Sequence, residues 1–282
     1  LTQYDVVGFQ TEHDVSSFIE VLARAGLLEA ELGDSRYRAC GREFTASAYP
    51  IGIDVPGVVR MAQRSVHSAT VSRMVHGLVG RDLIIGVDRL DYSKGLPERF
   101  RSFESLLQNY PDTRGRLVFM QIAPPTRSGV RAYQDIREEL ERSAGHINGG
   151  YAEPDWVPIR YLNKGFSRSM LMGLFRAAQI GLVTPLRDGM NLVAKEYVAA
   201  QNPENPGALV LSPLAGAAAE LDAAIIVNPF DTEGVAEAIQ QAVNMPLVER
   251  IERHQAMMSV LQRNDINAWT ERFVADLERV RA

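Results

Sequence analysis

The chain has 282 residues, a length that allows one large domain or two ordinary ones. Its hydrophobic share of 46% and charged share of 23% are typical of a globular protein and exclude a disordered or fibrous one. Thirty lysines and arginines against 35 aspartates and glutamates give a net charge of −5, which argues against nucleic-acid binding through a basic surface.

Other compositional features also restrict the class of protein. No segment reaches the roughly 18 uncharged apolar residues that a membrane span needs. The single cysteine, Cys40, excludes a disulfide framework and fits a reducing compartment. The start, Leu1–Asp5, has neither an initiating methionine nor the basic region of a signal peptide. We therefore expect a cytoplasmic protein whose front part is absent, with neither nucleic acid nor a membrane as partner.

The first part of the chain predicts few elements. Tyr4–Gln10 reads as a strand, Asp14–Leu28 as a helix and Phe44–Ile53 as a second strand. These elements are too few for an independent core. Asp54–Gly57 is a turn signal, and we expect a domain boundary between Asp54 and Asp82.

Along nearly the whole chain, short apolar runs alternate with amphipathic stretches. Strands are predicted at Val6–Phe9, Leu83–Val87, Leu117–Ile122, Ile159–Leu162, Ile180–Val183, Ala208–Leu211 and Ile225–Val227. Helices are predicted at Glu98–Gln108, Arg131–Arg142, Met170–Ala178, Leu192–Ala200, Asp231–Met245, Leu247–Arg263 and Ile266–Arg281. This order predicts a doubly wound α/β domain with a parallel sheet, in which ligands bind beyond the carboxyl ends of the strands.

One candidate binding segment, Pro185–Leu192, follows a predicted strand and opens a helix. A helix N-terminus suits a phosphate or sugar hydroxyls, and Gly189 allows close approach of the backbone. Asp188 lies at the rim and Glu196 two turns inside, so a ligand along the helix can meet both carboxylates. A helix cap at Asp188 and a solvated Glu196 explain the spacing equally well.

A second segment, at the end of the Leu83–Val87 strand, carries two cations. Arg89 and Lys94 lie on one strand-to-helix loop, and such a pair can hold a diphosphate and neutralise its charge as it leaves. An isolated pair of this kind is more often a surface ion pair of little energetic value.

Two further strand ends present residues of ligand-binding type. A Pro/Gly loop after Leu117–Ile122 presents Arg127, and the loop after Ile159–Leu162 presents Lys164 and Phe166. An aromatic ring there can cover a nucleobase, although such a phenylalanine is also common as a packing residue beside a helix start. Because four strand ends of one sheet carry such residues, we expect a binding site at that edge.

Several common motifs are missing from the sequence. There is no Gly-x-Gly fingerprint, no Gly-x-x-x-x-Gly-Lys, no pair of aspartates two residues apart and no Gly-x-Ser-x-Gly. The five histidines are scattered without ligand spacing. We therefore expect no metal site.

Three motifs make the sequence resemble the trehalose-6-phosphate synthase family, the retaining glycosyltransferases of family 20. These are Val87–Phe100 (VDRLDYSKGLPERF), Tyr133–Arg137 (YQDIR) and Pro185–Ala200 (PLRDGMNLVAKEYVAA). Shorter segments near both ends, including Gly8–Glu12 and Tyr49–Ile53, also look like that family, so the likeness covers the whole chain in order.

The resemblance implies a GT-B fold, with two Rossmann-like domains and the nucleotide sugar in the second. It implies transfer of glucose from UDP-glucose to glucose 6-phosphate, giving α,α-trehalose 6-phosphate and UDP, without a cofactor or a required metal. Residues 1–66 would be the end of the acceptor-side domain, 67–263 the donor domain and 264–282 a helix that crosses back to the first domain.

Carried over by motif, the resemblance also implies roles for single residues. Arg89 and Lys94 would hold the donor diphosphate, and Arg127 would reach the acceptor phosphate. Glu196 would bind the ribose and Phe166 would lie at the uracil. The transferred glucose and the phosphates would be held by Asp188 and by the backbone of Gly189, Met190, Asn191 and Leu192. Arg89, Lys94 and Asp188 would be the catalytic residues.

The sequence departs from the family at its front, where the glycine loop and most acceptor-binding residues do not occur. We therefore expect these 282 residues alone to bind UDP-glucose weakly at best and to be inactive. The alternatives left open are a glucosylglycerol-phosphate synthase, use of GDP or ADP in the donor, and a non-catalytic donor-binding or regulatory fragment. The resemblance also allows a homo-oligomer of the full-length protein.

Overall fold

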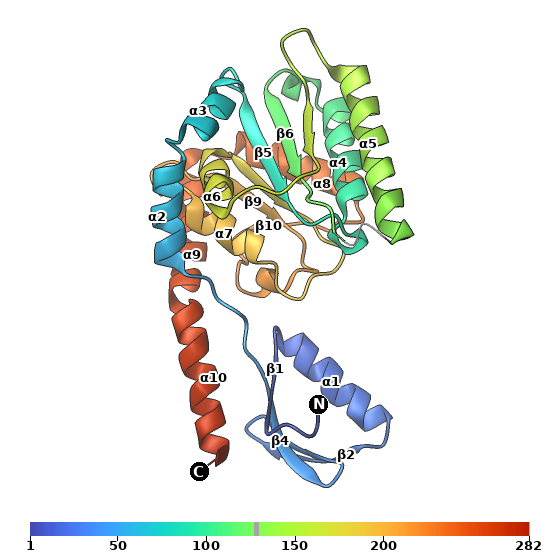
Figure 1. Cartoon of the computed structure of the whole chain (residues 1–282), viewed down its shortest axis with the longest axis vertical. Coiled ribbons are helices and arrows are strands. Elements are labelled where there is room, and N and C mark those ends of the chain that lie inside the picture. The colour runs from blue at the N-terminus through green and yellow to red at the C-terminus, as the bar shows by residue number, and fades with distance from the viewer. Residues whose placement is uncertain (127–129, 282) are drawn as a thin grey trace. The chain divides into compact units, whose positions relative to one another are not determined.

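The computed structural model describes residues 1–126 and 130–281, and the chain divides by its internal contacts into two units. The smaller unit consists of Leu1–Asp54 together with Gln262–Ala282, and the larger unit is Val55–Leu261 (Figure 1). Among the described residues, no helix combines the length and the apolar character needed to cross a membrane. Each unit has its own sheet.

The larger unit is built on a parallel sheet. Its strands are β5 (Asp82–Val87), β6 (Leu117–Ile122), β7 (Ile159–Leu162), β8 (Ile180–Val183), β9 (Ala208–Leu211) and β10 (Ile225–Ile226). They lie in the order β10-β9-β8-β5-β6-β7, and every pairing is parallel. The order reverses between β5 and β8, and ligands of such sheets bind beyond the carboxyl ends of the strands at this switch point.

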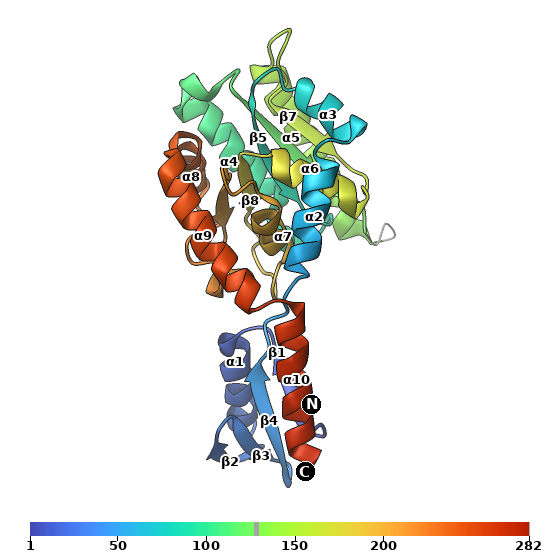
Figure 2. The same cartoon turned by 90° about the vertical axis from the view of Figure 1, so that its left-hand side faces the viewer.

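Helices cover both faces of this sheet (Figures 1 and 2). One layer contains α2 (Val55–Ser65), α3 (Ala69–His76), α6 (Arg168–Ala177) and α7 (Leu192–Ala200), and the other contains α4 (Leu96–Asn109), α5 (Arg131–Tyr151) and α8 (Thr232–Asn244). Helix α9 (Leu247–Arg263) follows α8. Because both faces are covered, the strands are apolar almost throughout, and Leu83 and Ile84 are fully buried.

The doubly wound α/β prediction is confirmed, and most predicted elements lie within a few residues of the observed ones. The largest difference concerns α5, which was expected to end at Arg142 and continues to Tyr151. The glycines at 145, 149 and 150 lower the helix propensity of this stretch. Burial of Ala144 and Ile147 on the same face as Leu140 continues it.

The smaller unit contains a mixed sheet with helices packed against it. Its elements are β1 (Val6–Phe9), α1 (Glu12–Arg24), β2 (Leu28–Gly33), β3 (Arg36–Ala39), β4 (Arg42–Ala48) and α10 (Ile266–Arg281). The sheet order is β1-β4-β3-β2, with β1 and β4 parallel and the other pairs antiparallel.

This unit contains more elements than the strand, helix and strand that the sequence predicted. The sequence analysis did not predict the β2–β3 hairpin, although Gly26, with φ of 68°, separates α1 from Leu28–Gly33, along which burial alternates. Its turn residues Asp34 and Ser35 both have positive φ, as a two-residue hairpin turn requires. Buried residues form a core between α1 and the sheet, namely Val7, Val15, Ile19, Leu22, Ala39, Phe44, Ala46 and Ala48.

Helix α10 packs on the segment that follows β4. The indole Nε1 of Trp269 donates to the Tyr49 carbonyl at 3.0 Å, and the Tyr49 hydroxyl donates to Asp276 at 2.8 Å. The Phe273 ring lies edge-on to Tyr49, with 5.0 Å between ring centroids. The last helix therefore belongs to the smaller unit, although it lies over 200 residues from Tyr49 in the sequence.

The observed division between the units lies at the start of the expected interval Asp54–Asp82, before residue 66, where the resemblance implied the end of the first domain. It falls between Asp54 and Val55, so α2 belongs to the larger unit. The cause is the apolar face of α2, where Val58 and Ala62 are buried against α6 and α7.

Truncating Phe44 tests whether the smaller unit has a core of its own. Phe44 is buried between α1 and the sheet, and Phe44→Ala should destabilise this unit by about 3–4 kcal/mol through lost burial and a cavity. Val21→Ala, at an exposed position on α1, should change stability by no more than about 0.5 kcal/mol. Urea unfolding followed by the fluorescence of Trp269, with Trp156 replaced by Phe, measures both. Equal small effects would contradict the assigned core.

Candidate functional site

Two loops meet at the switch point of the larger sheet. Residues 88–95 connect β5 to α4, and residues 184–191 connect β8 to α7. The amide groups of Leu186 and Arg187 both donate to the Ser93 carbonyl, at 2.8 and 3.1 Å. Gly95 has φ of 64°, and a Cβ at this position would lie 2.5 Å from the Thr184 carbonyl oxygen. The two loops are therefore in backbone contact.

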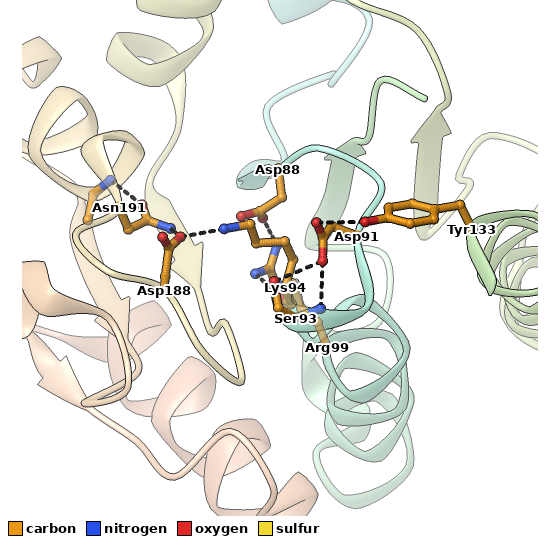
Figure 3. Close-up of polar contacts among 9 residues, drawn as sticks. Asp88, Asp91, Ser93, Lys94, Arg99, Tyr133, Asp188 and Asn191 are labelled. Carbon is orange, nitrogen blue, oxygen red and sulfur yellow. Dashed lines mark hydrogen bonds and ion pairs between the residues drawn. The ribbon is translucent and has the colours of Figure 1, made fainter. Parts of the chain in front are cut away.

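An ion pair joins the two loops (Figure 3). The Lys94 ammonium lies 2.7 Å from Oδ2 of Asp188, and the Asn191 side-chain amide donates to the same oxygen at 3.0 Å. The Lys94 and Asp188 side chains are 11% and 19% exposed, so each charge retains some access to solvent. The structure thus brings together two of the predicted catalytic residues and one of the predicted donor-binding residues.

Asn191 also forms the start of α7. It has φ of 75°, and its side-chain oxygen accepts from the Ala194 amide at 3.0 Å as the helix N-cap. The Gly216 amide donates to the Asp188 carbonyl and the Ala217 amide to the Met190 carbonyl. The N-terminus of α7 is therefore held in place beside the ion pair, and the N-terminus of a helix favours an anion.

The turn that carries Lys94 is fixed by Asp91. Its Oδ1 accepts from both the amide and the hydroxyl of Ser93, each at 2.9 Å, and Oδ2 accepts from the Tyr133 hydroxyl at 3.4 Å. The Tyr133 ring lies 5.9 Å from that of Tyr92, centroid to centroid. Helix α5 therefore supports this turn from outside the loop.

A fully buried guanidinium lies beneath the same turn. Arg99 of α4 donates from Nη1 to Asp88 at 2.6 Å and to Gln121 at 2.9 Å, and from Nε to Thr184 at 3.1 Å. Nη2 donates to the Lys94 carbonyl at 3.4 Å. Burial raises the pKa of the Asp88 carboxyl, and the contact with Arg99 opposes that rise.

Glu196 lies further along α7 and is paired with α6. Its Oε1 accepts from Nε and Nη2 of Arg168, at 3.2 and 2.9 Å. Burial raises the pKa of Glu196, while the Arg168 guanidinium lowers it. The Glu196 carboxylate is therefore paired and largely buried, and it is not the solvated carboxylate that the sequence spacing also allowed.

The remaining predicted site residues make fewer polar contacts with the described part of the chain. Phe166 is half-buried in the loop between β7 and α6, with the Lys164 ammonium 5.3 Å from its ring centroid. Arg89 is exposed on the β5–α4 loop, and it has no hydrogen bond or ion pair with another described residue. Leu192 is 39% exposed at the first position of α7, Gly189 is also exposed, and Arg127 lies outside the described residues.

Sequence reasoning missed Arg99 and Arg168. Arg99 carried a usable signal, because it falls on the apolar face of α4 between Leu96 and Phe103. A cation at a core position predicts a buried partner. Arg168 stands at the exposed start of α6, where nothing in the sequence links it to Glu196.

Chemically, this edge offers cations, carboxylates and helix amides within two loops and one helix. Cations and helix amides suit a phosphate, and carboxylates suit sugar or ribose hydroxyls. No group of three His, Cys, Asp or Glu residues that could hold a metal ion occurs in the ranges that the structure describes.

Comparison with known proteins agrees on one family. The sequence description of glycosyltransferase family 20 matches residues 1–279. Trehalose-6-phosphate synthase from Klebsiella pneumoniae subsp. pneumoniae is 51% identical over 280 residues, which are 99% of this chain and 59% of that protein. The chain therefore spans less than two thirds of the length of this curated relative.

Solved structures of such synthases are similar over nearly the whole chain, and two of them serve as examples. A UDP-forming α,α-trehalose-phosphate synthase from Burkholderia vietnamiensis has a TM-score of 0.97 and 51% identity, covering 100% of this chain and 63% of that one. A UDP-forming synthase from Burkholderia xenovorans, in complex with glucose 6-phosphate, has a TM-score of 0.96 and 50% identity, covering 99% and 62%.

Replacing Asp88, the counter-ion of Arg99, tests how much this buried ion pair contributes to stability. Asp88→Asn should destabilise the chain by about 3 kcal/mol, because it leaves a buried guanidinium without a negative partner. Asp155→Asn is the matched control, since it breaks a pair with Arg81 whose carboxylate is 78% exposed, and it should change stability by no more than about 0.5 kcal/mol. Urea unfolding measures both, and similar losses would contradict the assigned role of Asp88.

Proposed function

The chain belongs to glycosyltransferase family 20 and has the GT-B fold class; from that premise we propose that its larger unit binds the sugar nucleotide of a retaining glucosyl transfer. The donor is UDP-glucose and the acceptor is glucose 6-phosphate, giving α,α-trehalose 6-phosphate and UDP. The UDP-forming relatives support this choice of donor, and the glucose 6-phosphate complex of one of them supports the acceptor.

The observation that carries the proposal is the Lys94–Asp188 pair at the switch point. One group suits a phosphate and the other suits sugar hydroxyls, and both retain access to solvent. A sugar nucleotide offers these two kinds of partner at neighbouring positions. It can therefore replace the ion pair with two separate contacts, one to each side chain.

The cations act on the donor diphosphate. In the proposal, Lys94 exchanges Asp188 for a phosphate oxygen, and the exposed Arg89 on the same loop binds the diphosphate from its solvent side. Cations held in place before the reaction stabilise negative charge as it develops on a leaving group. They therefore favour departure of UDP.

The other residues hold the sugar, the ribose and the base. Asp188 and the backbone of residues 189–192 bind the glucose and the phosphates at the start of α7. Glu196, oriented by Arg168, binds the ribose hydroxyls, and Phe166 lies at the uracil. Arg127 contacts the acceptor phosphate. The site requires neither a metal nor a cofactor.

The reaction breaks the bond between the glucose C1 and the phosphate oxygen and forms a bond from C1 to the anomeric oxygen of the acceptor. With attack on the same face as departure, the configuration at C1 is retained. The leaving phosphate oxygen takes the proton of the acceptor hydroxyl. This scheme uses charges that stabilise the leaving diphosphate and needs no protein nucleophile.

Calorimetric titration tests the assignment of Asp188. Asp188→Ala should abolish the affinity advantage of UDP-glucose over UDP, because only the sugar nucleotide offers hydroxyls to the carboxylate. Affinity for UDP should be unchanged or increased, since Lys94 loses its competing partner. Asp222→Ala, at an exposed turn position of the same unit, is the control and should leave both affinities unchanged. Equal weakening of UDP and UDP-glucose would contradict the assignment.

The affinity for UDP-glucose should fall on acidification. Burial raises the pKa of Glu196, so its carboxylate becomes protonated at a higher pH than an ordinary glutamate. The protonated form accepts weaker hydrogen bonds from the ribose, whereas the diphosphate diester of UDP-glucose stays ionised. Titrations from neutral pH down through this raised pKa should show weakening binding in the native chain and little change in Glu196→Gln. Identical pH profiles would contradict the role of Glu196.

A further inference from the structure

We propose that Arg99 is a positioning residue for Lys94, setting where the Lys94 ammonium meets the donor diphosphate. The inference rests on the proposed function, in which Lys94 binds that diphosphate. Arg99 itself is fully buried and does not reach the ligand. It acts through the backbone of the loop that carries Lys94.

The guanidinium contacts the ends of three neighbouring strands, and Figure 3 shows its contact with Asp88. Asp88 follows β5, Gln121 lies near the end of β6 and Thr184 follows β8. With the Lys94 carbonyl, these contacts use four of the five N–H donors of the planar group. The Arg99 side chain therefore has a fixed orientation.

The contact with Lys94 transmits this orientation to the site. Nη2 of Arg99 donates to the Lys94 carbonyl, while the Lys94 ammonium faces Asp188. The backbone of Lys94 is thus held relative to Thr184, which begins the loop that carries Asp188. One buried group sets the separation of the two loops at the point where the proposed ligand enters.

Gly86 on β5 provides space for this arrangement. A Cβ at position 86 would lie 2.8 Å from Nη1 of Arg99 and 2.4 Å from Oε1 of Gln121. The guanidinium therefore packs directly on the strand backbone. A lysine at position 99 keeps the charge for Asp88, but it lacks the planar fork that also reaches Thr184 and Lys94.

A general structural role is the competing explanation, and a double-mutant cycle separates the two. If Arg99 only stabilises the sheet, its replacement weakens UDP binding equally whether or not Lys94 is present. If it positions Lys94, the effect disappears once the Lys94 ammonium is removed. Calorimetry with UDP is done on the native chain, Arg99→Lys, Lys94→Ala and the double variant.

We expect Arg99→Lys to weaken UDP binding about tenfold in the native background and less than about twofold in Lys94→Ala. Thr184→Val removes one acceptor with little change of shape and should weaken binding about threefold, again only when Lys94 is present. Arg101→Lys is the matched control on the exposed face of α4 and should leave the affinity unchanged. Equal losses in both backgrounds would overturn the inference.

A second measurement needs no ligand and covers variants that bind too weakly. Amide hydrogen exchange at Leu186 and Arg187 reports on the contact between the loops, because both amides bind the Ser93 carbonyl. Arg99→Lys should raise these exchange rates at least about threefold, and Arg101→Lys should not. Unchanged exchange in Arg99→Lys would overturn the inference.

Failure of the proposed function gives a different pattern. If the native chain binds UDP and Lys94→Ala binds it equally well, then Lys94 does not contact the diphosphate and the proposed site is wrong. If Lys94→Ala weakens binding but the cycle is additive, the site stands and the role of Arg99 is wrong.

Discussion

The buried ion pair between Arg99 and Asp88 is the interaction on which the rest of the site depends. Removing both charges from water is unfavourable, and the pair persists only because its remaining hydrogen-bonding groups are also satisfied. Here Gln121 and Thr184 supply those partners from the neighbouring strands β6 and β8. One guanidinium therefore contacts three strand ends and, through the Lys94 carbonyl, one loop of the switch point.

The Lys94–Asp188 pair above it differs in a way that suits binding. The pair is only partly buried. If Lys94 exchanges the carboxylate for a phosphate, one charge contact replaces another and no buried charge is left without a partner. In the structure the two groups neutralise each other. In the proposed function a sugar nucleotide separates them, and specificity for the complete donor follows from satisfying both at once.

The sequence predicted the parts of this structure that depend on local pattern. The apolar runs predicted the strands of the parallel sheet, and the rule that ligands bind at carboxyl ends predicted Lys94 and Asp188 at one edge of it. Contacts between distant segments were not predictable in this way. The pairing of Glu196 with Arg168 joins residues on two helices that are separate in the sequence. The β2–β3 hairpin has positive φ at Asp34 and Ser35, and neither residue is the glycine that usually marks such a turn.

The most direct test of the account is to locate the bound nucleotide by heteronuclear NMR of the chain titrated with UDP. We expect the largest amide shift changes in residues 88–95 and 186–192, at the carboxyl edge of the sheet. The opposite edge holds a cavity of about 500 Å³ lined by residues that include Arg176 and Arg250. Shift changes concentrated around that cavity, with none in the two loops, would contradict the account.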